Sequence, residues 1–356
     1  MMDIAELVAR QRAFFESGAT RAISYRAAAL QALEQAIRLH EKEICNALYN
    51  DLGKSSFESY MTEIGLVLDE LRFQRRHLAK FAKSKRARTP LAQFKASSRI
   101  LAEPYGVALV MSPWNYPFML TLDPIIGAIA AGNCVVVKPS AYSASTSELL
   151  RQLVSGLFQE DYIAVVPGGR AENALLLEQK FDYIFFTGGV GVGRLVMEKA
   201  AQHLTPLTLE LGGKSPCIVE RTANVKLAAK RIVFGKYLNA GQTCVAPDYL
   251  FVQEEVRDLL VGYIKQYITE FFGAKPLENR DFGRIINEKH FERLCRLMAG
   301  EQLLAGGGIN AQTRQIEPTV LGNITPDSRI MQEEIFGPIL PVLTFKQTQE
   351  VVQYVN

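Results

Sequence analysis

The feature that most constrains how this chain can fold is a regular alternation of apolar runs and helical patterns across residues 107–211. The apolar runs cover 107–111, 134–138, 162–166, 183–187 and 207–211, and helical patterns cover 123–131, 145–158, 172–178 and 194–203. Strands that are apolar on both faces are typical of parallel sheets covered by helices on each side. The alternation therefore predicts an α/β fold with a doubly wound parallel sheet of the nucleotide-binding type.

Weaker patterns flank this alternation. Before it, residues 25–52 and 63–83 are predicted as amphipathic helices, and the basic run 83–88 is interpreted as favourable charge at the end of the second one. After it, a second alternation predicts further α/β structure. Its elements are a helix at 225–238, a strand at 249–252, a helix at 255–271, a loop at 306–308, short strands around 335–338 and a helix from 348.

Length and charge limit the classes of protein to which the chain can belong. A chain of 356 residues can form two or three domains, and 40 basic against 37 acidic residues leave a net charge of only +3. This balance argues against binding to nucleic acid or to a membrane surface. The N-terminus lacks the apolar core of a secretory signal, and no apolar run reaches the roughly 20 residues of a membrane helix. We expect a cytoplasmic protein without a membrane segment.

The cysteines and histidines argue against a disulfide framework and against a metal site. Five cysteines are scattered along the chain without a Cys-x-x-Cys pair, and none of the four histidines has metal-ligand spacing. Four of the cysteines are interpreted as structural, because they fall on predicted helix faces or strand starts: Cys45, Cys134, Cys217 and Cys295. Cys244 differs, because it lies in a loop of small residues at 239–247.

Two short stretches carry residues suited to nucleophilic catalysis. Cys244 is a candidate nucleophile, because cysteine is the strongest side-chain nucleophile near neutral pH once it is ionised. Glu210 lies at the end of an apolar run, before Gly212-Gly213-Lys214, and is a candidate base that activates water for a second step. Taken singly, each has an ordinary interpretation: a lone cysteine is most often a small buried apolar residue, and a lone glutamate a solvated surface group.

The glycine-rich turn at 188–193 leaves two interpretations open. Helix N-termini preceded by glycines bind phosphate through free backbone N–H groups. The glycines at 188, 189, 191 and 193 do not form a G-x-G-x-x-G fingerprint, however. The turn is therefore equally consistent with a plain connection between a strand and a helix.

Six motifs follow one another in the order found in the aldehyde dehydrogenase superfamily. They are Pro113-Trp114-Asn115, Val137-Lys138-Pro139-Ser140, Phe186-Thr187-Gly188, Leu209 to Lys214, Gly241-Gln242-Thr243-Cys244 and Glu333 to Pro338. The chain resembles this superfamily over nearly its whole length. Its context at 203–207 and 246–249 is most similar to the class 3 branch, which acts on fatty and aromatic aldehydes.

The resemblance implies a reaction and assigns residues to it. Cys244, as thiolate, would attack the aldehyde carbonyl, and the Asn115 amide and the Cys244 backbone N–H would hold the oxyanion. Hydride transfer to the nicotinamide would leave a thioester, and water activated by Glu210 would hydrolyse it to a carboxylic acid. The implied cofactor is NAD, and the residues that would bind it are Pro113, Trp114, Lys138, Ser140, Thr187, Gly188, Gly189, Leu211, Glu334 and Phe336.

The family pattern also distributes these residues over the cofactor. Lys138 would hold the adenosine ribose, and the Gly188–Gly189 turn would approach the pyrophosphate. Thr187 and Leu211 would line the nicotinamide pocket, while Glu334 and Phe336 would hold the nicotinamide ribose and pack near the ring: this is implied by their motifs alone.

The chain departs from the family pattern in two places. Many NAD-preferring members have a glutamate that accepts from the ribose 2′-hydroxyl where this chain has Ala141, so we expect NADP to be accepted alongside NAD. The family's chain also continues past the Glu333–Pro338 motif and adds a C-terminal strand used in dimerisation. We therefore expect either a fragment of a longer gene product or a truncated and inactive protein, in which the C-terminal part of the fold and the interface strand of the implied homodimer are missing.

The expected domains follow from the same resemblance. Residues 1–210 would form the cofactor-binding domain, with 84–103 as an excursion to an oligomerisation hairpin, and 211–356 an incomplete catalytic domain.

Three alternatives to an NAD(P)-dependent aldehyde dehydrogenase remain open at this point. A CoA-acylating relative would transfer the acyl group to a thiol and would need no base for water, which Glu210 argues against. A non-catalytic cofactor-binding remnant would keep the site residues on an incomplete fold. A thiol hydrolase activity of Cys244 and Glu210 would be a side activity of the same site.

Overall fold

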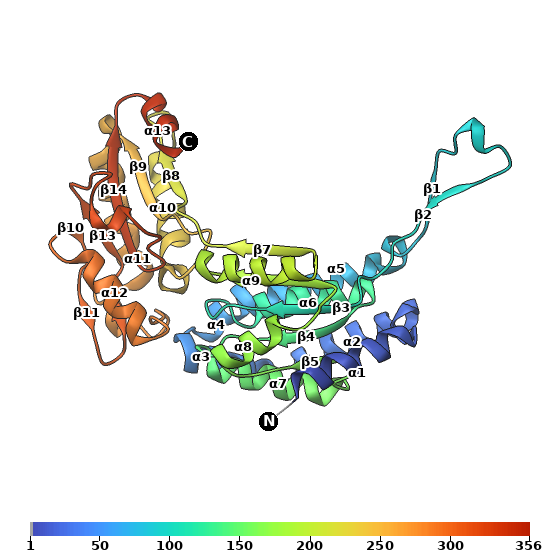
Figure 1. The fold of residues 1–356 in the computed structure, drawn as a ribbon. Coiled ribbons are helices and arrows are strands. Elements are labelled where there is room, and N and C mark those ends of the chain that lie inside the picture. Colours follow the sequence, from blue (N-terminus) through green and yellow to red (C-terminus); the bar gives the residue numbers. More distant parts are fainter. Residues whose placement is uncertain (1–2) are drawn as a thin grey trace. The chain divides into compact units, whose positions relative to one another are not determined.

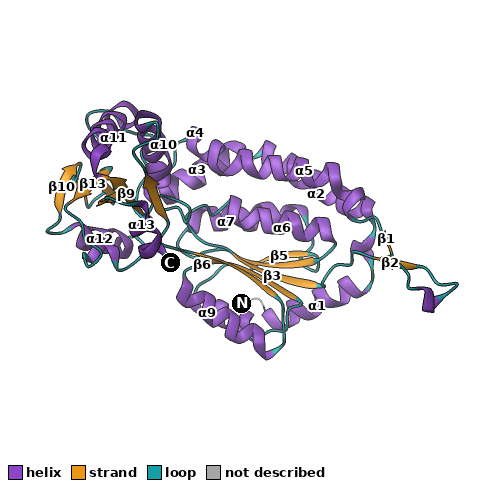
Figure 2. Cartoon of the chain, turned by 90° about the horizontal axis from the view of Figure 1, so that it is seen from above, coloured by secondary structure: helices purple, strands orange, loops and turns teal. Residues whose placement is uncertain are grey.

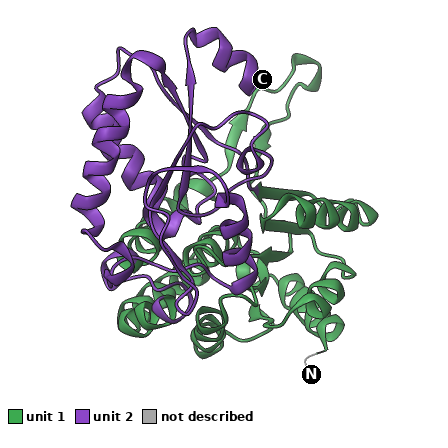
Figure 3. Ribbon diagram, turned by 90° about the vertical axis from the view of Figure 1, so that its left-hand side faces the viewer, with its two compact units in different colours: residues 1–48, 59–210 green, residues 49–58, 211–356 purple. Residues whose placement is uncertain are grey.

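The computed structural model describes residues 3–356, which form two compact units. The first unit holds the residues up to 48 together with 59–210, and the second holds 49–58 together with 211–356 (Figure 3). The boundary after Glu210 separates the two units. The short segment 49–58 belongs with the second unit, so neither unit is one continuous stretch of the chain.

The elements up to residue 211 are a set of helices, a two-stranded hairpin and a central sheet (Figure 1). The helices are α1 (Ile4–Glu16), α2 (Ile23–Leu39), α3 (Glu41–Leu52), α4 (Ser56–Ser59), α5 (Gly65–Phe81), α6 (Met119–Ala131), α7 (Ala144–Leu157), α8 (Arg170–Leu177) and α9 (Val190–Gln202). The strands are β1 (Lys85–Ala87), β2 (Ser98–Ile100), β3 (Val107–Met111), β4 (Cys134–Lys138), β5 (Ile163–Val165), β6 (Tyr183–Gly188) and β7 (Leu207–Leu211).

The central sheet of the first unit has the predicted doubly wound topology. Its strand order is β5-β4-β3-β6-β7, and β3 is parallel to both β4 and β6. Figure 2 shows α6 and α7 on one face of this sheet and α1 and α9 on the other. Every residue of β3 and β4 is buried, as two covered faces require. The predicted fold class is confirmed.

Two helix boundaries differ from the prediction for identifiable reasons. The pattern at 25–52 is divided into α2 and α3 at His40, whose backbone leaves the helical region. The buried apolar residues keep their helical spacing from α2 into α3, so the spacing of apolar residues in the sequence does not reveal the break. Helix α6 begins at Met119, four residues before the predicted start at 123, because the buried Glu63 carboxylate accepts from the N–H groups of Phe118 (2.8 Å) and Met119 (3.1 Å).

A hairpin leaves the body of the first unit after α5. Strands β1 and β2 pair antiparallel, with Lys85 opposite Ile100, and Figure 1 shows them extending away from the helices and the central sheet of this unit. The basic run predicted to lie at the end of a helix falls mostly in this hairpin, because α5 already ends at Phe81. At its tip, the side chains of Leu91 (94% exposed) and Phe94 (81% exposed) face solvent.

The second unit is built on another sheet. Its elements are β8 (Pro216–Val219), α10 (Val225–Tyr237), β9 (Tyr249–Gln253), α11 (Arg257–Phe272), α12 (Glu288–Met298), β10 (Gln302–Ala305), β11 (Ile309–Asn310), β12 (Gln315–Ile316), β13 (Thr319–Gly322), β14 (Ile339–Phe345) and α13 (Thr348–Val355). The strand order is β10-β13-β14-β9-β8, in which β13, β14, β9 and β8 run parallel and β10 is antiparallel.

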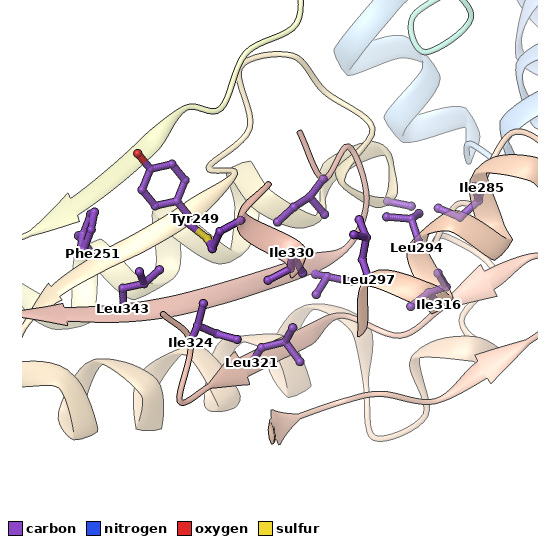
Figure 4. Close-up of a cluster of buried hydrophobic side chains, with 14 of the residues drawn as sticks. Tyr249, Phe251, Ile285, Leu294, Leu297, Ile316, Leu321, Ile324, Ile330 and Leu343 are labelled. Atoms are coloured by element: carbon purple, nitrogen blue, oxygen red, sulfur yellow. The ribbon is translucent and has the colours of Figure 1, made fainter. Parts of the chain in front are cut away.

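Two apolar clusters cover this sheet. One contains side chains of α10 and α11, such as Val233 and Ile264. The other, drawn in Figure 4, contains Tyr249, Leu294 and Leu343 from β9, α12 and β14. Because β8, β9 and β14 are parallel neighbours, the segments that lead into them meet at one edge of the sheet.

Candidate active site

The predicted site residues of the first unit lie where its parallel strands end. Asn115 follows β3, Lys138 ends β4, Thr187 lies at the end of β6, and Glu210 lies near the end of β7. The first strand of the sheet, β3, lies between β4 and β6: successive strands are added on one side of β3 up to β5 and on its other side from β6 onward, so the strand order reverses between β3 and β6. In open α/β sheets, ligands bind outside the carboxyl ends of the strands at such a switch point.

Asn115 occupies a short buried loop between β3 and α6. The loop is held at its start, where the Ser112 N–H donates to the Lys138 carbonyl (3.1 Å) and the Ser112 hydroxyl shares a 2.6 Å hydrogen bond with the Thr121 hydroxyl. Asn115 is only 3% exposed, while Pro113 and Trp114 before it are half-buried. An amide buried in this way is oriented by the fold before any ligand arrives.

The Lys138 ammonium links two loops at the same edge. Its Nζ donates to the carbonyls of Pro139 (2.8 Å) and Gly168 (2.7 Å), and the residue is 4% exposed. Burial lowers the pKa of Lys138, and the nearby Glu172 carboxylate acts in the opposite direction. An ammonium has three donors, and residues 3–356 accept from two of them, so one remains for a ligand. The Ser140 hydroxyl accepts from the Tyr142 N–H (3.2 Å) and closes the turn before α7.

The glycine-rich segment is more helical than the sequence predicts. Helix α9 begins at Val190 and not at 194, so Gly191 and Gly193 lie in its first turns and Gly189 is the residue before it. A Cβ on Gly189 or Gly191 would meet nothing within 4 Å, whereas Gly193 is buried. Just before the helix, the buried Thr187 Oγ1 has no hydrogen-bond partner among the described residues.

Glu210 and Leu211 lie at the end of β7, on either side of the division between the units. The Glu210 side chain is exposed, and Leu211 is half-buried. Glu210 is thus the last residue of the first unit, which also holds Asn115, and Cys244 belongs to the second.

Cys244 lies in a tightly constrained loop between α10 and β9. Asn239, Ala240 and Gly241 all have positive φ, at 53°, 50° and 74°. The fully buried Gln242 holds this turn, since its Nε2 donates to the Asn239 carbonyl (3.0 Å) and its Oε1 accepts from the Ile286 N–H (3.0 Å). Cys244 itself is half-buried.

The Cys244 loop is packed directly against the Glu333–Pro338 motif. A Cβ built on Gly241 would lie 2.2 Å from the Gly337 carbonyl oxygen, so only glycine allows this approach of two backbones. These segments are almost 100 residues apart in the chain, and their contact places the candidate nucleophile beside a predicted cofactor-binding motif.

Glu334 and Phe336 form the rest of this motif. The Gly213 N–H donates to Glu334 Oε1 (3.2 Å), and a Cβ on Gly212 would lie 2.1 Å from Glu334 Oε2. Burial is the main cause that raises the pKa of Glu334. Phe336 has a φ of 50°, a conformation that a non-glycine residue adopts only when its surroundings impose it.

Sequence reasoning gave no role to Lys214, Asp248 and Arg293, which surround this motif. Lys214 Nζ lies 2.6 Å from Asp248 Oδ2, and Arg293 donates to the Ile335 carbonyl (2.6 Å). Lys214 and Asp248 lie in stretches that resemble the family, and Arg293 lies within a helix, but a charged residue at such positions is too common to single out a site by itself.

The structure also bears on metal binding and on membrane insertion. Among residues 3–356, His, Cys, Asp and Glu side chains form no group of three that could hold a metal ion. In the same part of the chain, every helix is too short or too polar to cross a bilayer.

Known proteins place the chain in a family. The family model described as "Aldehyde dehydrogenase family" matches residues 1–356. The chain is 46% identical over 347 residues to the 4,4'-diaponeurosporen-aldehyde dehydrogenase of Staphylococcus aureus, covering 97% of this chain and 76% of that protein. It is 42% identical over 357 residues to the dimeric NADP-preferring aldehyde dehydrogenase of Canis lupus familiaris, covering 100% of this chain and 79% of the relative.

The fold agrees with this placement. A solved structure described as the substrate-bound state of Staphylococcus aureus AldH superposes with a TM-score of 0.98 at 44% identity, covering 100% of this chain and 78% of that one. The chain therefore belongs to the aldehyde dehydrogenase family of NAD(P)-dependent oxidoreductases.

Proposed function

We propose that this chain oxidises an aldehyde to a carboxylic acid with NAD(P), through a thioester on Cys244. The observation that carries the proposal is the packing of Gly241 on Gly337, which joins the Cys244 loop to the motif that contains Glu334. The thiohemiacetal that a cysteine forms with an aldehyde is still at the oxidation level of the aldehyde, and it becomes a thioester only if a hydride acceptor is bound close by. A nucleophile loop built against a cofactor-binding motif meets this requirement.

The residues of this chain have distinct tasks in the proposed reaction. The Cys244 thiolate attacks the carbonyl carbon, and the Asn115 amide and the Cys244 backbone N–H donate to the oxyanion. One donor of this kind contributes about 3–4 kcal/mol to stabilising the transition state. Glu210 accepts a proton from the water that attacks the thioester, and the carboxylic acid leaves as the thiolate re-forms. Bound NAD(P) supplies the hydride acceptor.

Several features of the first unit fit such a cofactor. The buried Thr187 Oγ1 without a partner is an orphaned polar group of the kind that a bound ligand satisfies. Lys138 has a donor left for a ribose hydroxyl, and open space adjoins Gly189 at the start of α9, where free N–H groups suit a pyrophosphate. The proposed cofactor residues are those assigned by the motifs: Pro113, Trp114, Lys138, Ser140, Thr187, Gly188, Gly189, Leu211, Glu334 and Phe336.

NADP is proposed as a second cofactor. The position at which a carboxylate would repel a 2′-phosphate is Ala141, whose side chain is exposed and uncharged. One similar protein carries the description NADP-preferring. Comparable kcat/KM values for NAD and NADP would support this proposal, and a preference for NAD above about 1,000-fold, or roughly 4 kcal/mol, would contradict it.

The same proposal assigns a role to each unit and to the hairpin. The first unit would bind most of the cofactor, the second would supply the nucleophile, and the hairpin of β1 and β2 would serve a homodimer. The substrate would be a medium- or long-chain aliphatic or an aromatic aldehyde, since the motif context is that of the class 3 branch.

The reaction is tested by following NAD(P)H formation with a panel of such aldehydes. We expect turnover by the unaltered chain and none by Cys244→Ala. Glu210→Gln should still give a first-turnover burst of NADH but should lose steady-state turnover, because thioester hydrolysis needs the base. Turnover retained by Cys244→Ala would refute the covalent mechanism. Steady-state turnover of Glu210→Gln restored by added CoA would point instead to an acyl-transferring relative.

A further inference from the structure

Asp248 is a buried charge that connects three neighbouring strands of the second unit. It directly precedes β9, the strand that lies between β8 and β14. The residue is 4% exposed. Its Oδ1 accepts from the Ile335 N–H (2.8 Å), on the segment leading into β14, and its Oδ2 accepts from Lys214 Nζ (2.6 Å), on the segment leading into β8. The backbone N–H of Asp248 donates to the Ser215 carbonyl (2.9 Å).

Lys214 extends this connection along the Glu333–Pro338 motif. In addition to Asp248, its Nζ donates to the carbonyls of Ile330 (3.1 Å) and Glu333 (2.9 Å). All three donors of the ammonium are therefore used, and two of them satisfy the backbone just before Glu334. Such charge-assisted hydrogen bonds are roughly twice as strong as neutral ones.

Arg293 holds the same segment from helix α12. It projects from α12, and its guanidinium donates to the carbonyls of Glu334 (3.2 Å) and Ile335 (2.6 Å). It also lies 3.6 Å from the Glu333 carboxylate. The backbone from 330 to 335 lies outside β14 and is thus fastened by charged side chains from three other parts of the unit.

We propose that Lys214, Asp248 and Arg293 are positioning residues, which hold Glu334 and Phe336 in the conformation that the nicotinamide half of the cofactor requires. This inference rests on the proposed function, in which Glu334 binds the cofactor. None of the three residues needs to touch the cofactor. Within the part of the chain that the structure describes, the Glu334 carboxylate accepts one hydrogen bond, from the Gly213 N–H (3.2 Å), so its direction depends on the backbone that carries it.

The expected effect follows from the cost of ordering a loop. If the segment is loosened, cofactor binding must order it again. The measured affinity for NAD then falls in proportion to the fraction of molecules whose segment is already in the binding conformation. In metal sites, loss of the contacts that support a ligating side chain typically reduces affinity by roughly 10- to 100-fold, and we expect the same range for NAD here. The loss should concern the cofactor and not the aldehyde.

The test compares Lys214→Met with a matched control, Lys275→Met. Lys275 forms an ion pair with Glu278 at 2.8 Å in the same unit, but both side chains are largely exposed. NAD binding to the full chain is measured by calorimetry, and the KM values for NAD and for the aldehyde are measured separately. We expect Lys214→Met to raise the Kd and KM for NAD by roughly 10- to 100-fold, with the aldehyde KM within about 2-fold, and Lys275→Met to change neither.

Glu334→Gln separates this inference from the proposed function. If Glu334→Gln leaves NAD binding unchanged, Glu334 is not a cofactor ligand and that part of the proposed function fails. If Glu334→Gln weakens binding but Lys214→Met does not, only the positioning inference fails. If both weaken binding, the double variant Lys214→Met/Glu334→Gln should have a Kd for NAD only slightly higher than that of Glu334→Gln alone, because Lys214 acts through Glu334. If the factors by which the two single substitutions raise the Kd for NAD multiply in the double variant, the inference is overturned.

A second variant covers the case in which Lys214→Met does not fold. Asp248→Asn keeps the volume and the Oδ1 acceptor for the Ile335 N–H, and it replaces Oδ2, which accepts from Lys214, with an uncharged NH2 group that cannot accept. We expect it to weaken NAD binding in the same direction by a smaller factor, and Lys214→Arg to restore more of the affinity than Lys214→Met retains. NAD affinity unchanged in Asp248→Asn would then overturn the inference.

Discussion

Replacing Gly241 by alanine should damage both the stability of the second unit and the catalytic activity. Gly241 has a φ of +74°, and a Cβ there would lie 2.2 Å from the carbonyl oxygen and 2.3 Å from the carbonyl carbon of Gly337. A left-handed conformation costs a non-glycine residue about 1–2 kcal/mol. The steric overlap involves backbone on both sides, which no rotamer change relieves, and adds roughly 1–3 kcal/mol.

The two contributions can be separated with a control at Gly300. Its φ of +82° is similar, but a Cβ there meets nothing within 4 Å. Gly300→Ala should therefore lose only the conformational part, about 1–2 kcal/mol. The total expected for Gly241→Ala is about 2–5 kcal/mol, so the difference between the variants measures how tightly the two loops are packed.

Thermal unfolding and NADH formation provide the assay. For units of 150–250 residues, 1 kcal/mol corresponds to a shift in Tm of about 2–4 °C. We expect Gly300→Ala to keep full activity, and Gly241→Ala to melt several degrees lower still and to lose most of its turnover, because Cys244 is three residues away. If Gly241→Ala has the same Tm as Gly300→Ala and stays active, the Cys244 loop is not packed on the Glu333–Pro338 motif as described, and the reasoning is refuted.

Three further outcomes are expected elsewhere. Burial lowers the pKa of Lys236 from 10.5 to about 8, so the cost of its charge, about 3 kcal/mol, is fully present below pH 8 and disappears as the pH rises to 10.5. Urea unfolding should therefore show Lys236→Met to be more stable than the unaltered chain below pH 8, with a gap that closes between pH 8 and 10.5; a constant gap would contradict this. Leu294→Ala, at a fully buried position of the cluster in Figure 4, should lose about 2–5 kcal/mol in the same assay. Glu63→Ala should lose about 1–3 kcal/mol and increase amide hydrogen exchange at Phe118 and Met119, since their N–H groups lose the carboxylate; unchanged exchange would argue against this cap.

The central sheet of the first unit could be predicted because its signal is local. Strands β3, β4 and β7 begin and end at the predicted residues, since β3 and β4 are nearly continuous apolar runs and β7 alternates apolar and polar residues. Helix starts were less predictable, because the start of α6 depends on Glu63, which lies 55 residues before Phe118 in the chain. The break between α2 and α3 was missed for another reason, since one apolar stripe continues across it.

The candidate site divides in the same way. Cys244, Glu210 and Asn115 could be proposed from the sequence because short motifs surround them, although their catalytic roles stay predictions. No pattern indicated that Lys214 and Asp248, 34 residues apart, share a hydrogen bond, or that Asp248 reaches Ile335, 87 residues further along. Those contacts require β8, β9 and β14 to lie side by side in that order.

The sequence by itself determined the type of fold and the chemical identity of the candidate site, because burial of apolar runs and short motifs are properties of neighbouring residues. The tertiary structure alone decided which distant segments meet: residues 49–58 with the second unit, and Gly241 against Gly337. The physical reason is that strand order and long-range polar pairing depend on how the whole chain packs, and a local pattern contains no record of its eventual partners.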